Sequence, residues 1–392
     1  MRVAISGAGI AGPTLAWWLA RDGHEITLIE KAESFRTGGY VIDFWGVGYD
    51  VAEKMGLLSS IHETGYQIDR VSCVGDDGGE QAKIPVSALS KPLKGRFTSI
   101  ARGDLAEIIF GALGPGIDTR FGTELTGARA DGSRMHCSLA SGEALEVDML
   151  VGADGLHSRV RELVFGEETR FAKDLGYRVA AFRTKGYRPR DEDVYVSYTK
   201  PGRSVSRFSM RGDETLFLFI FTAELMPGAM PEDDGAVRTL LREVFGGLGW
   251  ETLHILDVMD QTENIYFDTV SQIHMPTWSA GRTVLVGDAA ACISLLGGEG
   301  TGLAMAEAYV LAGELKRSGG DVEAAFEAYE RRLSGFLASK QKSAPRTASY
   351  FAPKSSFGLM VRNLVIHLMG LPLVTDLALG SAVKDRIDLP DY

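Results

Sequence analysis

The chain has 392 residues, a length that suits two lobes or one large α/β domain carrying an insertion. Hydrophobic residues make up 45% and charged residues 24%, a balance that excludes disordered, collagen-like and coiled-coil proteins. With 41 Lys and Arg against 52 Asp and Glu, the net charge is −11, which argues against nucleic acid as a partner.

The chain opens as strand, glycine turn, helix and strand. We expect strands at 2–6 and 25–30, and a helix over 13–21 with Pro13 in its first turn. A βαβ opening of this kind predicts a parallel sheet with helices on its faces.

The glycine turn reads Gly7-Ala8-Gly9-Ile10-Ala11-Gly12, a G-x-G-x-x-G pattern. Such glycines allow a tight turn and let the backbone approach a pyrophosphate at the helix N-terminus. Glu30 ends the second strand, where a carboxylate accepts hydrogen bonds from ribose hydroxyls, and an acid there favours FAD or NAD over NADP. We predict a dinucleotide site formed by Gly7, Gly9, Ile10, Ala11, Gly12, Glu30 and Lys31.

Short β-rich runs separated by turn residues occupy the middle of the chain, at 178–184, 194–198, 204–210 and 215–221. They predict an antiparallel sheet in a second lobe. Alternation along each strand turns about half of its aromatic side chains toward a pocket. We predict Phe208 and Phe219, with Leu296, as substrate-pocket residues; for each, the alternative is a place in the core of the sheet.

Two more segments have an apolar strand that ends at an aspartate. The first, 147–161, contains Asp154-Gly155 followed by Ser158 and Arg161; the second, 284–290, ends in Gly287-Asp288. A glycine-rich turn and an apolar helix over 303–315 follow the second segment. Either segment alone is also typical of a strand and turn with a capping Asp, but their combination with the first motif points to dinucleotide binding. The predicted contributors are Asp154, Gly155, Arg161, Gly287, Asp288, Gly298, Gly300, Thr301 and Gly302.

The C-terminal part is predicted to be helical. Helical spacing of apolar residues indicates a long helix over 321–342, and 357–383 is apolar with few charges and is interrupted by Pro372. The second stretch fits either an amphipathic segment on a membrane surface or a pair of helices that close over the interface between the lobes. The scarcity of cations favours the helices.

Compartment signals are few. The three cysteines, Cys73, Cys137 and Cys292, have neither a disulfide nor a metal spacing, so we expect reduced thiols in the cytoplasm and no metal. No signal peptide is visible, and no apolar run reaches the length of a membrane span.

Taken together, the three motifs resemble those of class A (single-component) FAD-dependent aromatic monooxygenases, the para-hydroxybenzoate hydroxylase superfamily. Within it the chain is most similar to the tetracycline-inactivating monooxygenases. The resemblance implies that Gly7–Gly12 and Glu30 hold the ADP half of FAD and that Asp288 lies at the ribityl and pyrophosphate region. It also implies a diphosphate contact for Arg102, at the start of a helix, a flavin-side position for Arg36, and a link between Asp154-Gly155 and NAD(P)H binding.

The fold implied by the resemblance is α/β. A Rossmann-like FAD-binding domain of the glutathione-reductase type (residues 1–70, 98–170 and 275–320) is interrupted by an antiparallel β-sheet substrate domain. That second domain comprises residues 71–97 and 171–274, and C-terminal helices at 321–392 bridge the two.

The implied function is an NADPH- or NADH-driven monooxygenase that inserts one atom of O2 into an aromatic or polycyclic molecule through a flavin C4a-hydroperoxide. Ala291, Leu295 and Gly302 replace the His, Pro and Asn that are common in the family. Two alternatives stay open, the first supported by Ala291 and Leu295, the second because a fold alone does not define a function. One is an FAD oxidoreductase without oxygen transfer, and the other a non-catalytic protein that binds flavin or an aromatic ligand. No catalytic residue is assigned, and we expect a monomer or weak homodimer.

Overall fold

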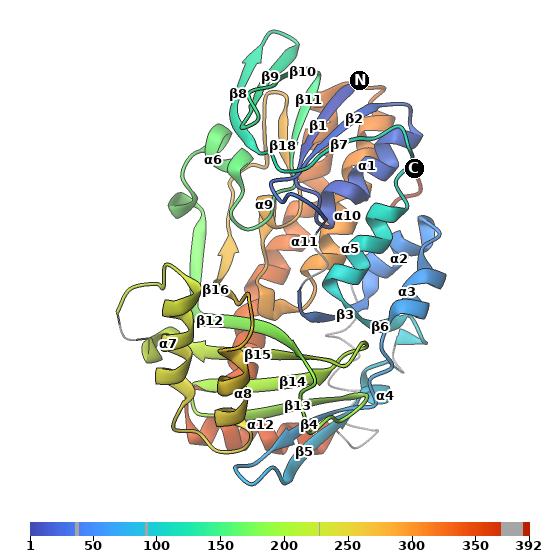
Figure 1. Ribbon diagram of the computed structural model, residues 1–392. Coiled ribbons are helices and arrows are strands. Elements are labelled where there is room, and N and C mark those ends of the chain that lie inside the picture. The colour runs from blue at the N-terminus through green and yellow to red at the C-terminus, as the bar shows by residue number, and fades with distance from the viewer. Residues whose placement is uncertain (36–38, 91–92, 227, 370–386) are drawn as a thin grey trace.

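The structure is a computed structural model that describes residues 1–35, 39–90, 93–226, 228–369 and 387–392. Two large sheets lie at opposite ends of the molecule, and helices fill the space between and around them (Figure 1). Both chain ends lie beside the six-stranded sheet.

The six-stranded sheet has the order β17-β18-β11-β1-β2-β7, and all neighbours are parallel except β17 and β18. Parallel neighbours require crossover connections, so this sheet joins segments that are far apart in the sequence. The predicted opening is confirmed: β1, α1 (Ala11–Arg21) and β2 follow one another. The strands are β1 Arg2–Ser6, β2 Glu25–Ile29, β7 Asp118–Arg120, β11 Met149–Gly152, β17 Ser279–Ala280 and β18 Thr283–Leu285.

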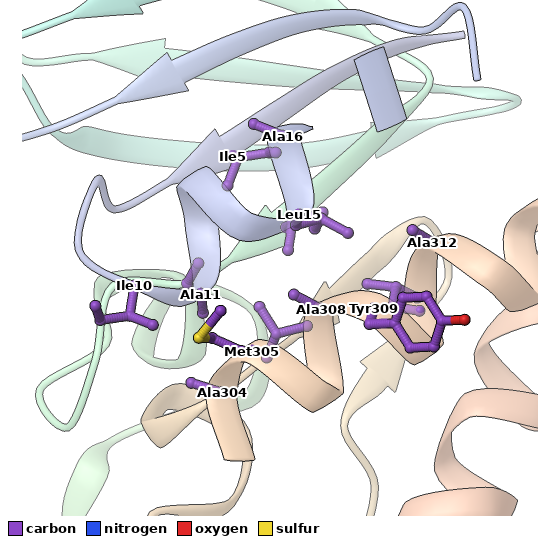
Figure 2. Close-up of a cluster of buried hydrophobic side chains, with 14 of the residues drawn as sticks. Ile5, Ile10, Ala11, Leu15, Ala16, Ala304, Met305, Ala308, Tyr309 and Ala312 are labelled. Atoms are coloured by element: carbon purple, nitrogen blue, oxygen red, sulfur yellow. The ribbon is translucent and has the colours of Figure 1, made fainter. Parts of the chain in front are cut away.

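Helix α10 (Gly300–Arg317) runs through the centre of this lobe, and every residue from Leu303 to Leu315 is buried. It packs against α1, where Ala11 and Leu15 face Ala304, Met305 and Ala308 (Figure 2). Because this helix is buried on all sides, its sequence is apolar on every face rather than on one. The other helices of this lobe are α2 Gly46–Lys54, α3 Leu58–Thr64, α5 Arg102–Gly111, α6 Arg159–Phe165 and α9 Asp288–Ala291.

The seven-stranded sheet has the order β16-β12-β15-β14-β13-β4-β5. The prediction of an antiparallel sheet holds for every pair but one: β4, from an early segment, pairs with β13 in parallel. Strand β12 is also longer than its predicted apolar run. The strands are β4 Arg70–Val74, β5 Glu80–Pro85, β12 Ala172–Lys185, β13 Val194–Lys200, β14 Arg203–Ser209, β15 Glu214–Thr222 and β16 Tyr266–Ile273.

The two faces of this sheet have different partners. Helices α7 (Asp234–Phe245) and α8 (Thr252–Met259) cover one face with a large apolar cluster. The other face turns to the six-stranded lobe and packs against residues such as Ala101 and Leu296. Smaller elements complete the fold: β3 Val41–Trp45 with β6 Phe97–Ala101, β8 Leu125–Asp131 with β9 Arg134–Leu139 and β10 Ala144–Val147, and α4 Val86–Ser90. Short 3₁₀ turns are η2 Glu168–Arg170, η3 Ala223–Leu225 and η4 Leu295–Gly297.

Helix α11 spans Val322–Phe351, so the expected end at Lys342 is wrong. Pro345 lies inside the helix and has no N–H to donate to the carbonyl of Gln341, four residues earlier. The Gln272 amide from β16 supplies the missing donor, with its Nε2 2.8 Å from Gln341 O. A side chain of the seven-stranded lobe therefore pairs the carbonyl that Pro345 leaves without a donor, and α11 continues beyond the proline.

The last helix, α12 (Ser356–Met369), packs against β5. Its opposite side exposes Phe357, Met360 and Leu364. Residues 370–383 of the predicted helix pair lie outside the described residues. In the described part of the chain, no helix has the length and apolarity that crossing a membrane requires.

Candidate functional site

The glycine turn lies at the carboxyl end of β1, in the middle of the parallel sheet. Gly7 has a φ of 107°, and a Cβ on it would lie 2.4 Å from Ala153 O. A Cβ on Gly12 would lie 1.9 Å from the carbonyl oxygen of Gly7. Neither position accepts a side chain, so the first motif folds back on itself and abuts the second.

The N-terminus of α1 is free to meet an anion. No side chain caps it at Ile10, and its first turn contains no acidic residue. The nearest atom to a Cβ on Gly9 would be a guanidinium nitrogen of Arg102, 3.8 Å away. Unpaired helix N–H groups opposite an arginine match the chemistry of a pyrophosphate.

Glu30 closes the other side of this turn. Its carboxylate accepts hydrogen bonds from the N–H groups of Ala8 and Ala32, each at 2.9 Å. These contacts fix the half-buried carboxylate beside the glycine turn, and its remaining lone pairs can accept from ribose hydroxyls. Lys31 is exposed next to it.

The third motif reaches the same place from β18. Gly287 has a φ of 65°, and a Cβ on it would lie 3.3 Å from that of Ala11 and 3.2 Å from that of Ala304. Asp288 follows, with its Oδ1 3.6 Å from the Cβ position of Gly300. Burial raises the pKa of Asp288, while Arg102 and the Cys292 thiol act in the opposite direction.

Helix α10 begins next to Asp288 with Gly300, Thr301 and Gly302. Its N-terminus at Glu299 has no side-chain cap, and the first turn has no acid. Gly298 precedes it with a φ of 71°. The close neighbour of Gly302 is Gly48 in α2, where a Cβ would lie 2.3 Å from Gly302 Cα. Two uncapped helix N-termini, those of α1 and α10, thus open onto one site.

The second motif supports this site from behind. Asp154 accepts hydrogen bonds from Ser158 Oγ at 2.5 Å and from Val160 N at 3.0 Å, which caps α6. Arg161 is fully buried and donates to Ala289 O at 3.2 Å, within α9. Gly155 provides the turn between them, with a φ of 83°. The side chains of this motif therefore brace the loops beside the first and third motifs, and their contact with the cofactor stays a prediction.

Of the predicted pocket residues, Phe208 and Leu296 are buried on the sheet face that meets the six-stranded lobe. Phe219 requires a correction. It lies on the opposite face against α7, with its ring 5.0 Å from that of Phe245. Because successive side chains alternate between faces, Leu216 and Leu218 take the inward positions of β15 instead.

Arg36 lies outside the described residues. Arg102 begins α5, and its N–H donates to Tyr40 O at 2.9 Å, which brings the tyrosine close to Asp288 and Cys292. The structure therefore gathers the described members of the first and third motifs, with Arg102, around one cradle.

Glu307 and Tyr329 were not predicted from the sequence as residues of the site. Glu307 is 2% exposed and accepts a hydrogen bond from Gly287 N at 2.7 Å, directly beneath the third motif. The available signal was a glutamate in the middle of an apolar helix, since buried acids are rare unless they are bonded.

Comparison with known proteins identifies the family. The model of a family described as FAD binding domain matches residues 1–333. An uncharacterized protein of Mycobacterium tuberculosis is 35% identical over 340 residues, covering 86% of this chain and 91% of that protein. A flavin-dependent monooxygenase from an unknown prokaryotic organism is 32% identical over 402 residues, covering 100% of this chain and 99% of that protein. The crystal structure of tetracycline destructase Tet(55) is similar with a TM-score of 0.85 at 29% identity, covering 100% of this chain and 98% of that chain.

The cradle, the fold and these relatives define an FAD-dependent monooxygenase. The chain belongs to the FAD-binding domain family. The resemblance drawn from the three motifs is confirmed.

Proposed function

We propose that the chain transfers one oxygen atom from O2 to an aromatic or polycyclic small molecule, with NADPH or NADH as reductant. The observation that carries the proposal is the apolar face of the seven-stranded sheet, where Ala181, Phe208 and Leu216 form one cluster with Ala101. Ala101 directly precedes Arg102 of the cradle, so this face borders the six-stranded lobe at that point.

The donor set of the cradle fits FAD. The α1 N-terminus and Arg102 would hold the pyrophosphate, Glu30 the ribose, Asp288 the ribityl chain, and the α10 N-terminus the electron-rich edge of the flavin ring. When bound, FAD supplies the electron transfer that activates O2.

The chain itself binds, orients and excludes water. Apolar side chains on the inward sheet face limit solvent access at the reacting edge, a condition that oxygen transfer requires. Tyr195 lies beside this cluster, its ring centroid 6.4 Å from that of Phe208. Burial raises the pKa of Tyr195 to about 12, so its hydroxyl stays neutral and can hydrogen-bond a polar substituent of the substrate.

The relatives support a fused-ring substrate. Tet(55) and Tet(51) are named tetracycline destructases, and each is 29% identical to this chain. A flat apolar wall suits a rigid ring system, because such a ligand loses little conformational freedom on binding.

The test is an aerobic reaction of the purified holoenzyme with NADPH or NADH, with tetracycline and a panel of polyphenols as probes. We expect substrate-stimulated consumption of the reductant and a product that carries one atom from isotopically labelled O2. Consumption that yields only peroxide with every probe would indicate an oxidoreductase without oxygen transfer. Ligand binding with no consumption would indicate a binding protein.

We also propose the domain division 1–70, 98–170 and 275–320 against 71–97 and 171–274, with 321–392 as a bridge. The membership of the strands in the two large sheets supports it. A monomer or weak homodimer in the cytoplasm is part of the same proposal, and sedimentation analysis tests the oligomeric state.

A further inference from the structure

Glu307 lies in the centre of α10, beneath the end of β18. Its side chain is 2% exposed, and its Oε2 accepts a hydrogen bond from Gly287 N at 2.7 Å. The hydroxyl of Tyr329, from α11, lies 3.1 Å from the same oxygen. A single carboxyl oxygen therefore connects the third motif to two helices.

Hydrogen counting indicates the protonation state of this carboxyl. The Tyr329 hydroxyl has one hydrogen but two neighbours that can accept it, Glu307 Oε2 at 3.1 Å and Leu285 O at 3.2 Å. A neutral Glu307 satisfies both contacts, because its own hydrogen goes to Tyr329 and the tyrosine hydrogen goes to Leu285 O. A carboxylate at Glu307 would leave one of these contacts without a hydrogen.

The surrounding charges favour the same form. Burial raises the pKa of Glu307 to about 8, the Gly287 N–H and the Tyr329 hydroxyl lower it, and the Asp288 carboxylate raises it further. Burial and the negative charge of Glu330, also on α11, raise the pKa of the neighbouring Tyr329 hydroxyl. An ionised Glu307 would add a second negative charge beside the place where FAD brings its own phosphates.

We propose that Glu307 is a positioning residue: a neutral carboxyl that fixes the Gly287 backbone and thereby holds Asp288 in place in the FAD site. Gly287 has a φ of 65° and a ψ of −143°, a conformation that glycine adopts most readily, so the turn has no side chain of its own to fix it. The hydrogen bond to Glu307 fixes the Val286–Gly287 peptide, one residue before Asp288. Without it, Asp288 would lose its fixed position next to Arg102.

The experiment is a titration of the apoprotein with FAD, followed by flavin fluorescence, for the wild type, Glu307→Gln and Glu307→Leu. Glutamine keeps an acceptor for Gly287, so we expect its Kd below pH 8 to stay within about threefold of the wild type. Leucine removes the acceptor that fixes Gly287, so Asp288 loses its position in the FAD site, and we expect a Kd roughly 10-fold weaker or more.

The matched control is Glu314→Leu. Glu314 is a buried glutamate of the same helix, 6% exposed, but its partners are Arg332 and Tyr392, away from the cradle. We expect this variant to lose thermal stability while its Kd for FAD stays unchanged. A loss of FAD affinity equal to that of Glu307→Leu would show a general packing effect and overturn the proposal.

The pH profile provides a readout that does not depend on folding of the leucine variant. In the wild type, FAD affinity should fall as the pH rises through about 8, because Glu307 ionises beside the phosphates. Glu307→Gln should show no transition there. If the glutamine variant keeps the wild-type profile, Glu307 is not the titrating group and the proposal fails. Both measurements concern cofactor binding, so they are independent of whether oxygen transfer occurs.

Discussion

Asp288 shows how the site depends on one side chain. It follows a glycine whose φ of 65° disfavours any side chain, and the charge of Arg102 and the Cys292 thiol both act on it. Burial raises its pKa, and the positive charge of Arg102 opposes that shift. Its position beside Gly300 places it at the uncapped N-terminus of α10.

Replacement of this side chain should remove FAD. We expect Asp288→Ala to purify with little flavin, because a charge-assisted hydrogen bond contributes roughly 10-fold or more in affinity. Asp288→Asn keeps the shape and should retain part of the flavin. The ratio of flavin absorbance to protein measures this, and full occupancy of Asp288→Ala would contradict the assignment of the third motif.

At the scale of single residues, the sequence predicted the FAD cradle better than the substrate pocket. Gly7, Glu30 and Asp288 belong to strand ends whose direction follows from a parallel sheet, so the sequence alone brings them together. Phe219 could not be placed, because β15 is apolar on both faces and alternation does not say which face turns inward. Glu307 was missed since its partner Gly287 contributes only a backbone group.

Among the elements, α11 and β16 depend on each other. Pro345 removes the donor for Gln341 O, and Gln272 replaces it while also donating to Ile293 O at 2.9 Å. The Gln341 side-chain amide in turn donates hydrogen bonds to Ile273 O and Cys292 O. The helical spacing of apolar residues predicted this helix only as far as Lys342. Its continuation past Pro345 depends on a donor from a distant strand, which has no local sequence signal.

This compensation can be tested with a double-mutant cycle. Gln272→Leu should lower the free energy of unfolding by roughly 2 kcal/mol or more, since two buried carbonyls lose their donor. Pro345→Ala restores an N–H donor for Gln341 O. In that background, Gln272→Leu should lower the free energy of unfolding by about 1 kcal/mol less than in the wild type. Denaturant unfolding measures both. Exposed Lys342→Ala is the control on the same helix, and equal costs of Gln272→Leu in the two backgrounds would contradict the argument.

The molecule as a whole is two sheets held together by contacts that span long stretches of sequence. His157, beside the second motif, reaches Asp268 of β16 at 3.3 Å and Glu168 at 2.9 Å. The sheets themselves were predictable, because each follows from local periodicity and turn residues. Their mutual arrangement was not, because pairs such as His157 and Asp268 are 111 residues apart and carry no local signal.

This contact makes the association of the two lobes dependent on pH. The hydrogen bond to Asp268 is the largest cause that raises the pKa of His157 from 6.5 to about 9, and burial opposes it. Tyr266 also donates to Asp268, and Arg161 to Glu168. Although burial opposes the shift, the hydrogen bonds from His157 and Tyr266 lower the pKa of Asp268. A raised histidine pKa contributes stability that is complete below 6.5 and is lost as the pH rises through about 9.

We therefore expect the melting temperature of His157→Gln to fall below that of the wild type at pH values under 6.5, and the difference to vanish above about 9. The effect should be modest, because the His157 side chain is 60% exposed and solvent screens the pair. His136→Gln is the control: its partner Asp131 lies 3.5 Å away within the same small sheet, so it links no lobes. A difference that persists unchanged to high pH would show that His157 acts through packing and not through charge.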